Sequence, residues 1–246
     1  MLNSIAQDFE ISPSVVGLVV TLTQIGYALG LIFIVPLGDL IDNRRLIVSQ
    51  CVLSIVALVA IMTSSTEYIF FASLASMGIL AVVVQVLVSL AATLATPAER
   101  GKAVGIVTSG VVIGILAARV IAGLLADLGG WRAVYLTSAI LTATMVVLLI
   151  LVLPRDTKPR STDSYAITLR SIPILFMHDH FLLVRGFLAL LIFATFSTFW
   201  TGLVLPLSAP PFSYSHTQIG LFGLVGMAGA IAARRAGELA DRGYGN

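Results

Sequence analysis

Long apolar runs alternate with short charged clusters along the chain. Four runs contain no Asp, Glu, Lys or Arg at all: 11–38, 46–66, 68–98 and 133–154. An α-helix needs about 20 residues to cross the roughly 30 Å hydrocarbon core of a bilayer. Each run therefore predicts one membrane-spanning helix.

Two further stretches predict three more spans. Residues 103–126 are apolar except for Arg119, which gives one span with a single internal charge. Residues 186–233 are uncharged but too long for one crossing, and the turn-rich segment 208–218 divides them into two. We predict seven spans in all, at about 14–36, 46–64, 68–94, 103–126, 132–153, 184–206 and 217–236.

Composition supports this prediction. Hydrophobic residues make up 58% of the 246 residues and charged residues 11%, against roughly 25% charged in soluble globular chains. These values exclude a soluble protein and predict an all-α, polytopic membrane protein. The net charge of +2 comes from arginines between apolar runs, so nucleic acid is not an expected partner, and the lone Cys51 excludes an intramolecular disulfide. We expect no metal site and no cofactor.

All but two of the fourteen Lys and Arg residues fall on one side of the predicted topology; the exceptions are Arg132, in a loop on the other side, and Arg119, inside a span. The others follow the first, third, fifth and seventh spans: Arg44, Arg45, Arg100, Lys102, Arg155, Lys158, Arg160, Arg170, Arg185, Arg234, Arg235 and Arg242. Cytoplasmic loops carry the excess of Lys and Arg in membrane proteins. We therefore predict a multi-pass protein of the cell membrane, inner or plasma, with its N-terminus outside and its C-terminus in the cytoplasm. A polar cytoplasmic linker is predicted at 154–182.

The first and seventh spans repeat one another. The segment 12–17 matches 215–220 at an offset of 203 residues, and 35–39 matches 237–241 at an offset of 202. Six spans, an even number, separate the two copies, so both have the same orientation in the membrane. This is the pattern of a parallel repeat.

An acidic and basic motif follows each copy. The second copy reads Gly-Glu-Leu-Ala-Asp-Arg at 237–242, and the first reads Pro-Leu-Gly-Asp-Leu-Ile-Asp-Asn-Arg-Arg at 36–45. Both resemble Gly-x-Leu-Ala-Asp-Arg-x-Gly-Arg-Arg, the signature loop of the major facilitator superfamily, and we favour Asp39 over Asp42 as the acid of the first copy. The resemblance implies a cytoplasmic gate formed by motif residues: Gly38, Asp39, Asp42, Arg44, Arg45, Gly237, Asp241 and Arg242.

Two other segments resemble the drug and sugar efflux branch of this family. They are 96–105, similar to its loop between helices four and five, and 128–132, similar to its turn between helices five and six. In this register the seven spans match family helices two to eight. The resemblance implies a first half at 1–153 that lacks most of helix one, and the start of a second half at 183–246. A doubled repeat has roughly 400 residues, so we expect a truncated chain or gene fragment that does not transport by itself.

Arg119 is the leading candidate for substrate binding because it is charged and lies well inside a predicted span. A charge at bilayer depth costs at least about 2.5 to 3.5 kcal/mol unless it faces a partner or water. The family's antiporter motif on helix five, Gly-x-x-x-Gly-Pro-x-x-Gly-Gly, resembles 114–123, with Arg119 in place of the proline. Thr108 lies three turns earlier on nearly the same face. The alternative is that Arg119 snorkels outward, because it lies only two turns from Asp127, just past the end of its span.

Other polar and aromatic residues are candidates for lining a cavity. Gln24 and Tyr27 lie one turn apart on the first span, and Gln85 lies on the third. Hydrogen bonds between helices are an equal alternative for the two glutamines. Trp200 belongs to an aromatic stripe on the sixth span, which either packs against neighbours or stacks on a substrate.

Small residues recur every four positions in two spans and predict close contact between helix backbones. The first span carries Gly26 and Gly30, and the fourth carries Gly110 and Gly114. Packing of this kind is compatible with helices that move against one another.

Together with the resemblance, these residues predict a secondary transporter that exports a small solute, such as a sugar or drug, in exchange for protons by alternating access. A seven-helix receptor or sensor is one alternative, and a non-transporting fragment is another. No Asp, Glu or His lies inside a predicted span, which leaves an intramembrane hydrolase without catalytic groups, so we do not expect an enzyme. The sequence carries no signal for an oligomeric state.

Overall fold

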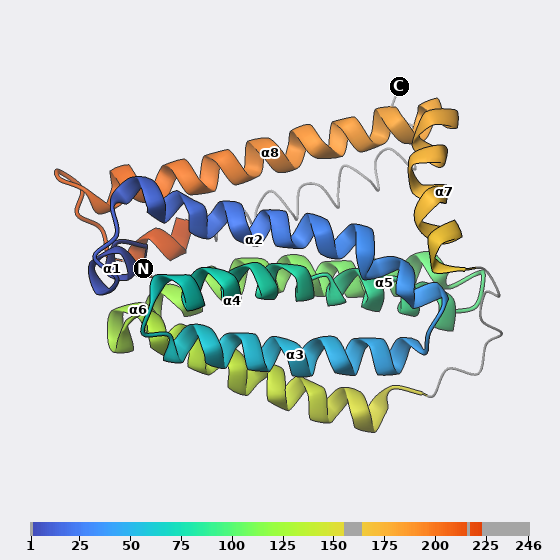
Figure 1. Ribbon diagram of the computed structural model, residues 1–246, viewed down its shortest axis with the longest axis horizontal. Coiled ribbons are helices and arrows are strands. Elements are labelled where there is room, and N and C mark those ends of the chain that lie inside the picture. The colour runs from blue at the N-terminus through green and yellow to red at the C-terminus, as the bar shows by residue number, and fades with distance from the viewer. Residues whose placement is uncertain (1, 155–163, 216, 223–246) are drawn as a thin grey trace.

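The computed structural model describes residues 2–154, 164–215 and 217–222. Within these ranges the chain forms helices and turns without a strand, and the long helices run side by side (Figure 1). The elements are α1 Leu2–Asp8, α2 Pro13–Phe33, the 3-10 helix η1 Val35–Asp39, α3 Asn43–Thr63, α4 Glu67–Leu80, α5 Val83–Leu94, α6 Arg100–Val152, α7 Tyr165–His178 and α8 His180–Ser208. Residues 217–222 begin a further helix.

Five helical stretches in the described part of the chain are long and apolar enough to cross a bilayer. One of them, α6, contains two predicted spans, because helical residues continue on both sides of Gly130, which turns the chain at φ 74°. The third predicted span is divided into α4 and α5 by a turn at Ala81 and Val82. The all-helical, multi-pass class is confirmed. The number seven stays a prediction, since the last span extends beyond the described residues.

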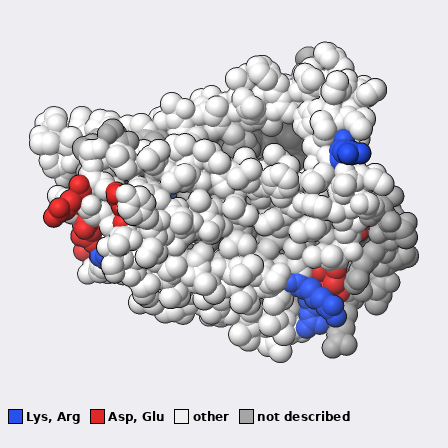
Figure 2. Space-filling model, viewed as in Figure 1, with Lys and Arg blue, Asp and Glu red and all other residues white. Residues whose placement is uncertain are grey.

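On the face that Figure 2 shows, the charged residues gather toward the two ends of the helix bundle. Figure 2 shows acidic residues at the end that holds α1, a basic cluster with adjacent acids toward the other end, and a broad uncharged band between them. We call these the Asp8 end and the Asp42 end. Apolar surface of this extent is stable when lipid covers it.

Glycines allow α2 and α4 to touch along their backbones. A Cβ atom added to Gly26 would lie 2.3 Å from the carbonyl oxygen of Ala75, and one added to Gly78 would lie 2.3 Å from that of Thr23. The close packing predicted at Gly26 is therefore confirmed, and Gly30 meets Ile79 in the same way.

The small-residue stripe on α6 behaves differently. No described atom lies within 4 Å of a Cβ added at Gly110 or Gly114. Close packing at these two glycines stays a prediction, because residues 223–246, which continue the helix that contacts α6 at Arg119 through Gly220, lie outside the described part.

Two apolar clusters hold the helices together, one at each end. The cluster at the Asp8 end joins α1, α2, α3, α4 and α6 through Ile5, Val19, Ile61, Phe70, Leu74 and Trp131. The cluster at the Asp42 end joins α3, α5 and α6 through Leu46, Ile47, Cys51, Val86, Leu90 and Val146. The second half of α6 packs along α3 between these two clusters (Figure 1).

The predicted linker at 154–182 contains a helix that the sequence did not lead us to expect. In Figure 1, α7 runs across the Asp42 end and meets α8 at an angle. The hydroxyl of Tyr165 at its start donates to the carbonyl oxygen of Phe33, at 2.7 Å, which ties α7 to the end of α2. Residues 155–163 of the predicted linker lie outside the described part.

Candidate functional site

Arg119 lies in the first half of α6 and meets α8 through aromatic rings. Its guanidinium carbon is 4.0 Å from the centroid of the Trp200 ring and 5.7 Å from that of Phe196. Trp200 is 9% exposed and also packs edge to face against Phe199, at 5.6 Å. Arg119 therefore sits over a wall of aromatic side chains that α8 supplies.

The guanidinium lacks polar partners within the described part of the chain. It forms no ion pair or hydrogen bond there, and its Nε atom is buried with nothing to accept the proton it carries. The Arg119 side chain lies over Trp200, and the Asp127 carboxylate accepts from Thr217. Cation–π contact compensates only part of the cost of a charge in an apolar setting.

Asp127, two turns beyond Arg119, binds the helix that begins near residue 217. Its Oδ2 accepts from the backbone N–H of Thr217 at 2.9 Å and from the Thr217 hydroxyl at 2.7 Å. A carboxylate at a helix N-terminus satisfies free N–H groups and complements the helix dipole. Gly220 lies one turn further, where an added Cβ would be 2.6 Å from the carbonyl oxygen of Arg119. The two helices are thus in close contact beside the arginine.

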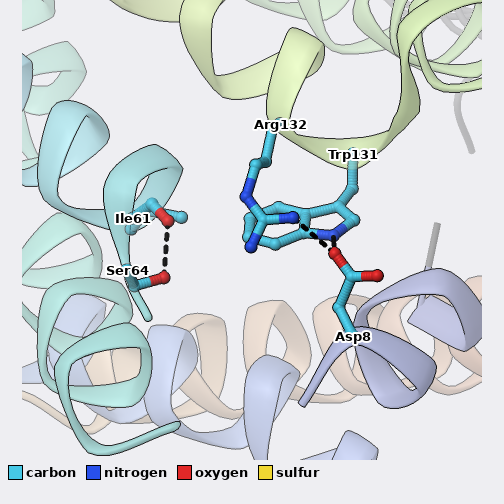
Figure 3. Close-up of polar contacts among 5 residues, drawn as sticks. All are labelled: Asp8, Ile61, Ser64, Trp131 and Arg132. Carbon is cyan, nitrogen blue, oxygen red and sulfur yellow. Dashed lines mark hydrogen bonds and ion pairs between the residues drawn. The ribbon is translucent and has the colours of Figure 1, made fainter. Parts of the chain in front are cut away.

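The Asp8 end is fastened by a carboxylate that two neighbouring side chains share (Figure 3). Asp8 Oδ2 accepts from the indole N–H of Trp131 at 2.8 Å and pairs with the Arg132 guanidinium. These contacts connect α1 to the turn at Gly130, across 123 residues of sequence. On the α3 side of the same view, the Ser64 hydroxyl donates to Ile61 and closes the end of that helix.

Acidification is expected to loosen this connection. The Trp131 hydrogen bond, followed by that of Arg132, holds the pKa of Asp8 below its ordinary value. A carboxyl whose pKa is lowered by folding stabilises the fold above its unfolded pKa of about 3.9, and this contribution is lost as the pH falls through the lower, folded value. We expect the unfolding temperature of the detergent-solubilised protein to decrease when the pH is lowered below about 4. The variant Asp8→Asn should show a weaker dependence of unfolding temperature on pH.

The effect of Asp8→Asn at pH 7 should be small, on the order of 1 kcal/mol or less, because both partners are partly exposed to solvent. Thermal unfolding from pH 7 to pH 3 makes the comparison. Superimposable pH profiles for the two proteins would show that Asp8 does not carry this contribution.

The motif residues near the Asp42 end are only partly engaged. Asp42 is buried and caps α3 by accepting from the backbone N–H of Arg45 at 2.8 Å. Arg44 donates to the Ile150 carbonyl oxygen at 2.5 Å, where the last turn of α6 leaves carbonyls free. Asp39, which we favoured as the motif acid, is exposed and forms no ion pair with another described residue.

A pocket of about 420 Å³ opens beside this motif. It is lined by Asp42, Arg44, Arg45, Val48 and Ile150. Gly38 lies close by, and a Cβ added there would be 3.1 Å from the side-chain oxygen of Asn43. The second copy of the motif, with Gly237, Asp241 and Arg242, lies outside the described residues.

The other candidates for lining a cavity, Gln24, Tyr27, Gln85 and Thr108, form no hydrogen bond with Arg119 in the described part of the chain. The side-chain amide of Gln85 donates to the hydroxyl of Tyr27 at 3.0 Å, which links α5 to α2. A hydrogen bond between helices was one of the two alternatives for Gln85. Gln24 and Thr108 are exposed. Their place in a cavity remains a prediction.

Several contacts at the site were not predicted from the sequence. The contacts of Asp8 with Trp131 and of Asp127 with Thr217 are two of them. The two residues of each contact lie far apart in the sequence, so no local spacing reveals the contact. The spacing of Ser215 and Gln218 is a sequence signal for the helix that begins near residue 217. The Gln218 side chain accepts from the backbone N–H of Ser215, and the Ser215 hydroxyl accepts from the backbone N–H of Gln218, as in a capping box.

The fold and this site define a multi-pass helical membrane protein with a half-buried arginine that lies over aromatic rings of a second helix. The family model of the Major Facilitator Superfamily matches residues 1–246, and the chain belongs to this family. The resemblance drawn from the motifs is thereby confirmed.

Relatives are described as transporters. The "Putative uncharacterized transporter YgaY" of Escherichia coli strain K12 is 46% identical over 243 residues, which are 99% of this chain and 61% of that protein. The "Probable transporter SCO4007" of Streptomyces coelicolor is 33% identical over 243 residues, 98% of this chain and 56% of that relative. The chain spans about three fifths of the length of these curated relatives.

Proposed function

We propose that this protein is a secondary transporter that moves a small solute across the cell membrane by alternating access, with Arg119 in the solute site. The single observation that carries the proposal is the Arg119 guanidinium, held inside the bundle over Trp200 without a polar partner in the described chain. An intramembrane charge that is retained without a partner is a functional group by default. The relatives named as transporters support the same class.

We place the Asp42 end in the cytoplasm and the N-terminus outside. Arg44, Arg45 and the start of α6 at Arg100 lie toward the Asp42 end, and the excess of basic residues marks the cytoplasmic side. In this orientation the motif residues around Asp42 lie at the cytoplasmic gate, and Asp8 closes the outer side. Export in exchange for protons is the direction that the efflux-branch resemblance supports.

The movement follows from the placement of the site. Arg119 belongs to the proposed first half, at 1–153, and Trp200 to the proposed second half, at 183–246, with the linker 154–182 between them. Rocking of one half against the other changes which side of the membrane reaches the arginine. The Asp127 contact with Thr217 joins the same two halves near the outer side and must open when the site faces outward.

Flux measurements test the proposal. The chain is expressed by itself and, in parallel, joined to the part of the E. coli relative that extends beyond the match. Inverted membrane vesicles with a pH gradient are screened for uptake of labelled sugars, drugs and organic anions. We expect at least one solute to accumulate with the extended protein, and Arg119→Ala to reduce its uptake at least tenfold, which corresponds to about 1.4 kcal/mol.

Each arm of this experiment has its own consequence. Uptake that an uncoupler abolishes supports proton exchange, and uptake that persists argues against it. Ile113→Ala is the matched control, because residue 113 lies on the same half of α6, is 58% exposed and lies about 120° around the helix from Arg119. Flux that is unchanged by Arg119→Ala for every solute removes Arg119 from the site. If no solute moves in either form, the non-transporting alternative replaces the transporter.

A further inference from the structure

The chemistry around Arg119 narrows the class of solute, if the proposed solute site is accepted as the starting point. A guanidinium has five N–H donors and no acceptor. An aromatic face attracts its charge but offers no lone pair in the plane of those donors. In the described chain Trp200 and Phe196 are what the guanidinium contacts, and Nε is buried without an acceptor. The described chain supplies no acceptor to Nε, so a ligand with oxygen lone pairs would supply what the aromatic rings cannot.

The charge that the ligand can carry depends on how many Lys and Arg side chains lie near the site. Arg119 is the only Lys or Arg between Lys102 and Arg132, and the nearest basic residue before Trp200 is Arg185. The Arg185 guanidinium lies over Phe181, at 4.0 Å, a full fifteen positions before Trp200. One cation compensates one negative charge, and a second negative charge in an apolar site would stay uncompensated. The site therefore fits a monoanion better than a phosphate dianion.

The polarity of the rest of the ligand depends on the aromatic side chains that surround the site. Trp200 is nearly buried, Phe196 is 44% exposed beside it, and Phe199 packs on the far edge of Trp200. These rings supply apolar surface and, except for the indole N–H, no polar group. A strongly hydrated sugar would lose hydrogen bonds to water against such walls without regaining them.

We infer that Arg119, together with Phe196 and Trp200, binds a small organic carboxylate: the carboxylate pairs with the guanidinium, and an apolar body rests against the rings. Carboxylate oxygens match the planar fork of arginine and make the stronger, charge-assisted type of hydrogen bond. Because α6 contributes the charge and α8 the rings, a bound carboxylate contacts both proposed halves at once. This inference rests on the proposed solute site and adds its chemical class.

Fluorescence of Trp200 reports on the site directly. The chain has two tryptophans, Trp131 and Trp200. In the Trp131→Phe variant Trp200 is the sole indole, while a phenyl ring keeps the apolar contact at the Asp8 end. The 246-residue protein, in lipid nanodiscs, is titrated with phenylacetate, with its uncharged amide phenylacetamide, and with inorganic phosphate. We expect saturable change of Trp200 emission with phenylacetate and at least about tenfold weaker binding of the amide, since a hydrogen bond to a charged group is lost.

Variants of the arginine separate charge from packing. Arg119→Gln should remove the preference for phenylacetate over its amide, and Arg119→Lys should keep part of it, because the charge remains without the fork. Arg185→Gln is the matched control: it removes an arginine that also stacks on a phenylalanine of α8, and it should leave the titration unchanged. Size-exclusion profiles show whether each variant is folded.

The outcomes are decisive in both directions. Equal binding of acid and amide, tighter binding of phosphate, or an unchanged preference in Arg119→Gln overturns the carboxylate assignment. So does the absence of any emission change together with no ligand-induced rise in unfolding temperature. Carboxylate binding without flux supports the assignment and contradicts transport by this protein. Flux that depends on Arg119 but shows no preference for acids leaves transport standing and overturns the carboxylate assignment.

Discussion

Replacing Gly26 by alanine is expected to destabilise the packed helices. The added methyl group would lie 2.3 Å from the Ala75 carbonyl oxygen and close to the backbone of Gly78, so α2 and α4 must move apart. Overpacking of this kind costs typically about 1 to 3 kcal/mol, and here the obstructing atoms are backbone. Thermal unfolding in detergent and the yield of monodisperse protein measure the effect.

Gly17→Ala is the control for Gly26→Ala because both residues lie on α2. Nothing described lies within 4 Å of a Cβ at Gly17. Alanine is a better helix former than glycine by about 1 kcal/mol, so this change should leave stability unchanged or raise it. The two substitutions are thus expected to have opposite signs. A loss at Gly17 equal to that at Gly26 would mean that helix contact is not the cause.

Trp131→Ala is expected to have a comparable or larger effect at the Asp8 end. The ring is 3% exposed and lies 5.5 Å from Phe70, 5.9 Å from Phe9 and 5.9 Å from Tyr135, measured between centroids. Removing a buried aromatic side chain costs about 3 to 5 kcal/mol, and the change also removes the hydrogen bond to Asp8. The unfolding temperature of the variant should fall accordingly.

Two further variants separate the contributions of Trp131. Trp131→Phe keeps a ring in the cluster but loses the indole N–H, so it should retain most of the stability and lose much of the dependence on acid. Tyr68→Ala removes an aromatic ring from the same end of the bundle, on α4, where the residue is 79% exposed, and should have little effect. Equal losses in Tyr68→Ala and Trp131→Ala would exclude burial as the explanation.

Much of the helical fold could be predicted from the sequence because bilayer thickness dictates helix length. The uncharged runs at 11–38 and 46–66 became α2 with η1 and α3, within a few residues of the predicted bounds. The glycines of α2 marked a real helix contact for the same physical reason, that only a missing side chain lets backbones approach. The helix α7 was not predicted, because polar and charged residues flank its apolar positions on both sides.

The candidate site was predicted only in part. A charge at 119 inside an apolar run is visible in the sequence, and so is the aromatic stripe that includes Trp200. The contact between Arg119 and Trp200 could not be predicted from the sequence. It depends on where α8 lies relative to α6, and the periodicity of side chains within one helix does not give the position of a second helix. Gly110 and Gly114 illustrate the same limit: their spacing predicts contact but does not say which helix arrives there.

The bond from Asp127 to Thr217 has a consequence for biosynthesis. Asp127 and Thr217 are separated by 90 positions, so the ribosome adds Asp127 to the chain long before it adds Thr217. Until α8 has been inserted into the lipid, Asp127 lacks its two hydrogen bonds from Thr217. Joining of the two segments at that point is therefore a late event that follows membrane insertion of α8.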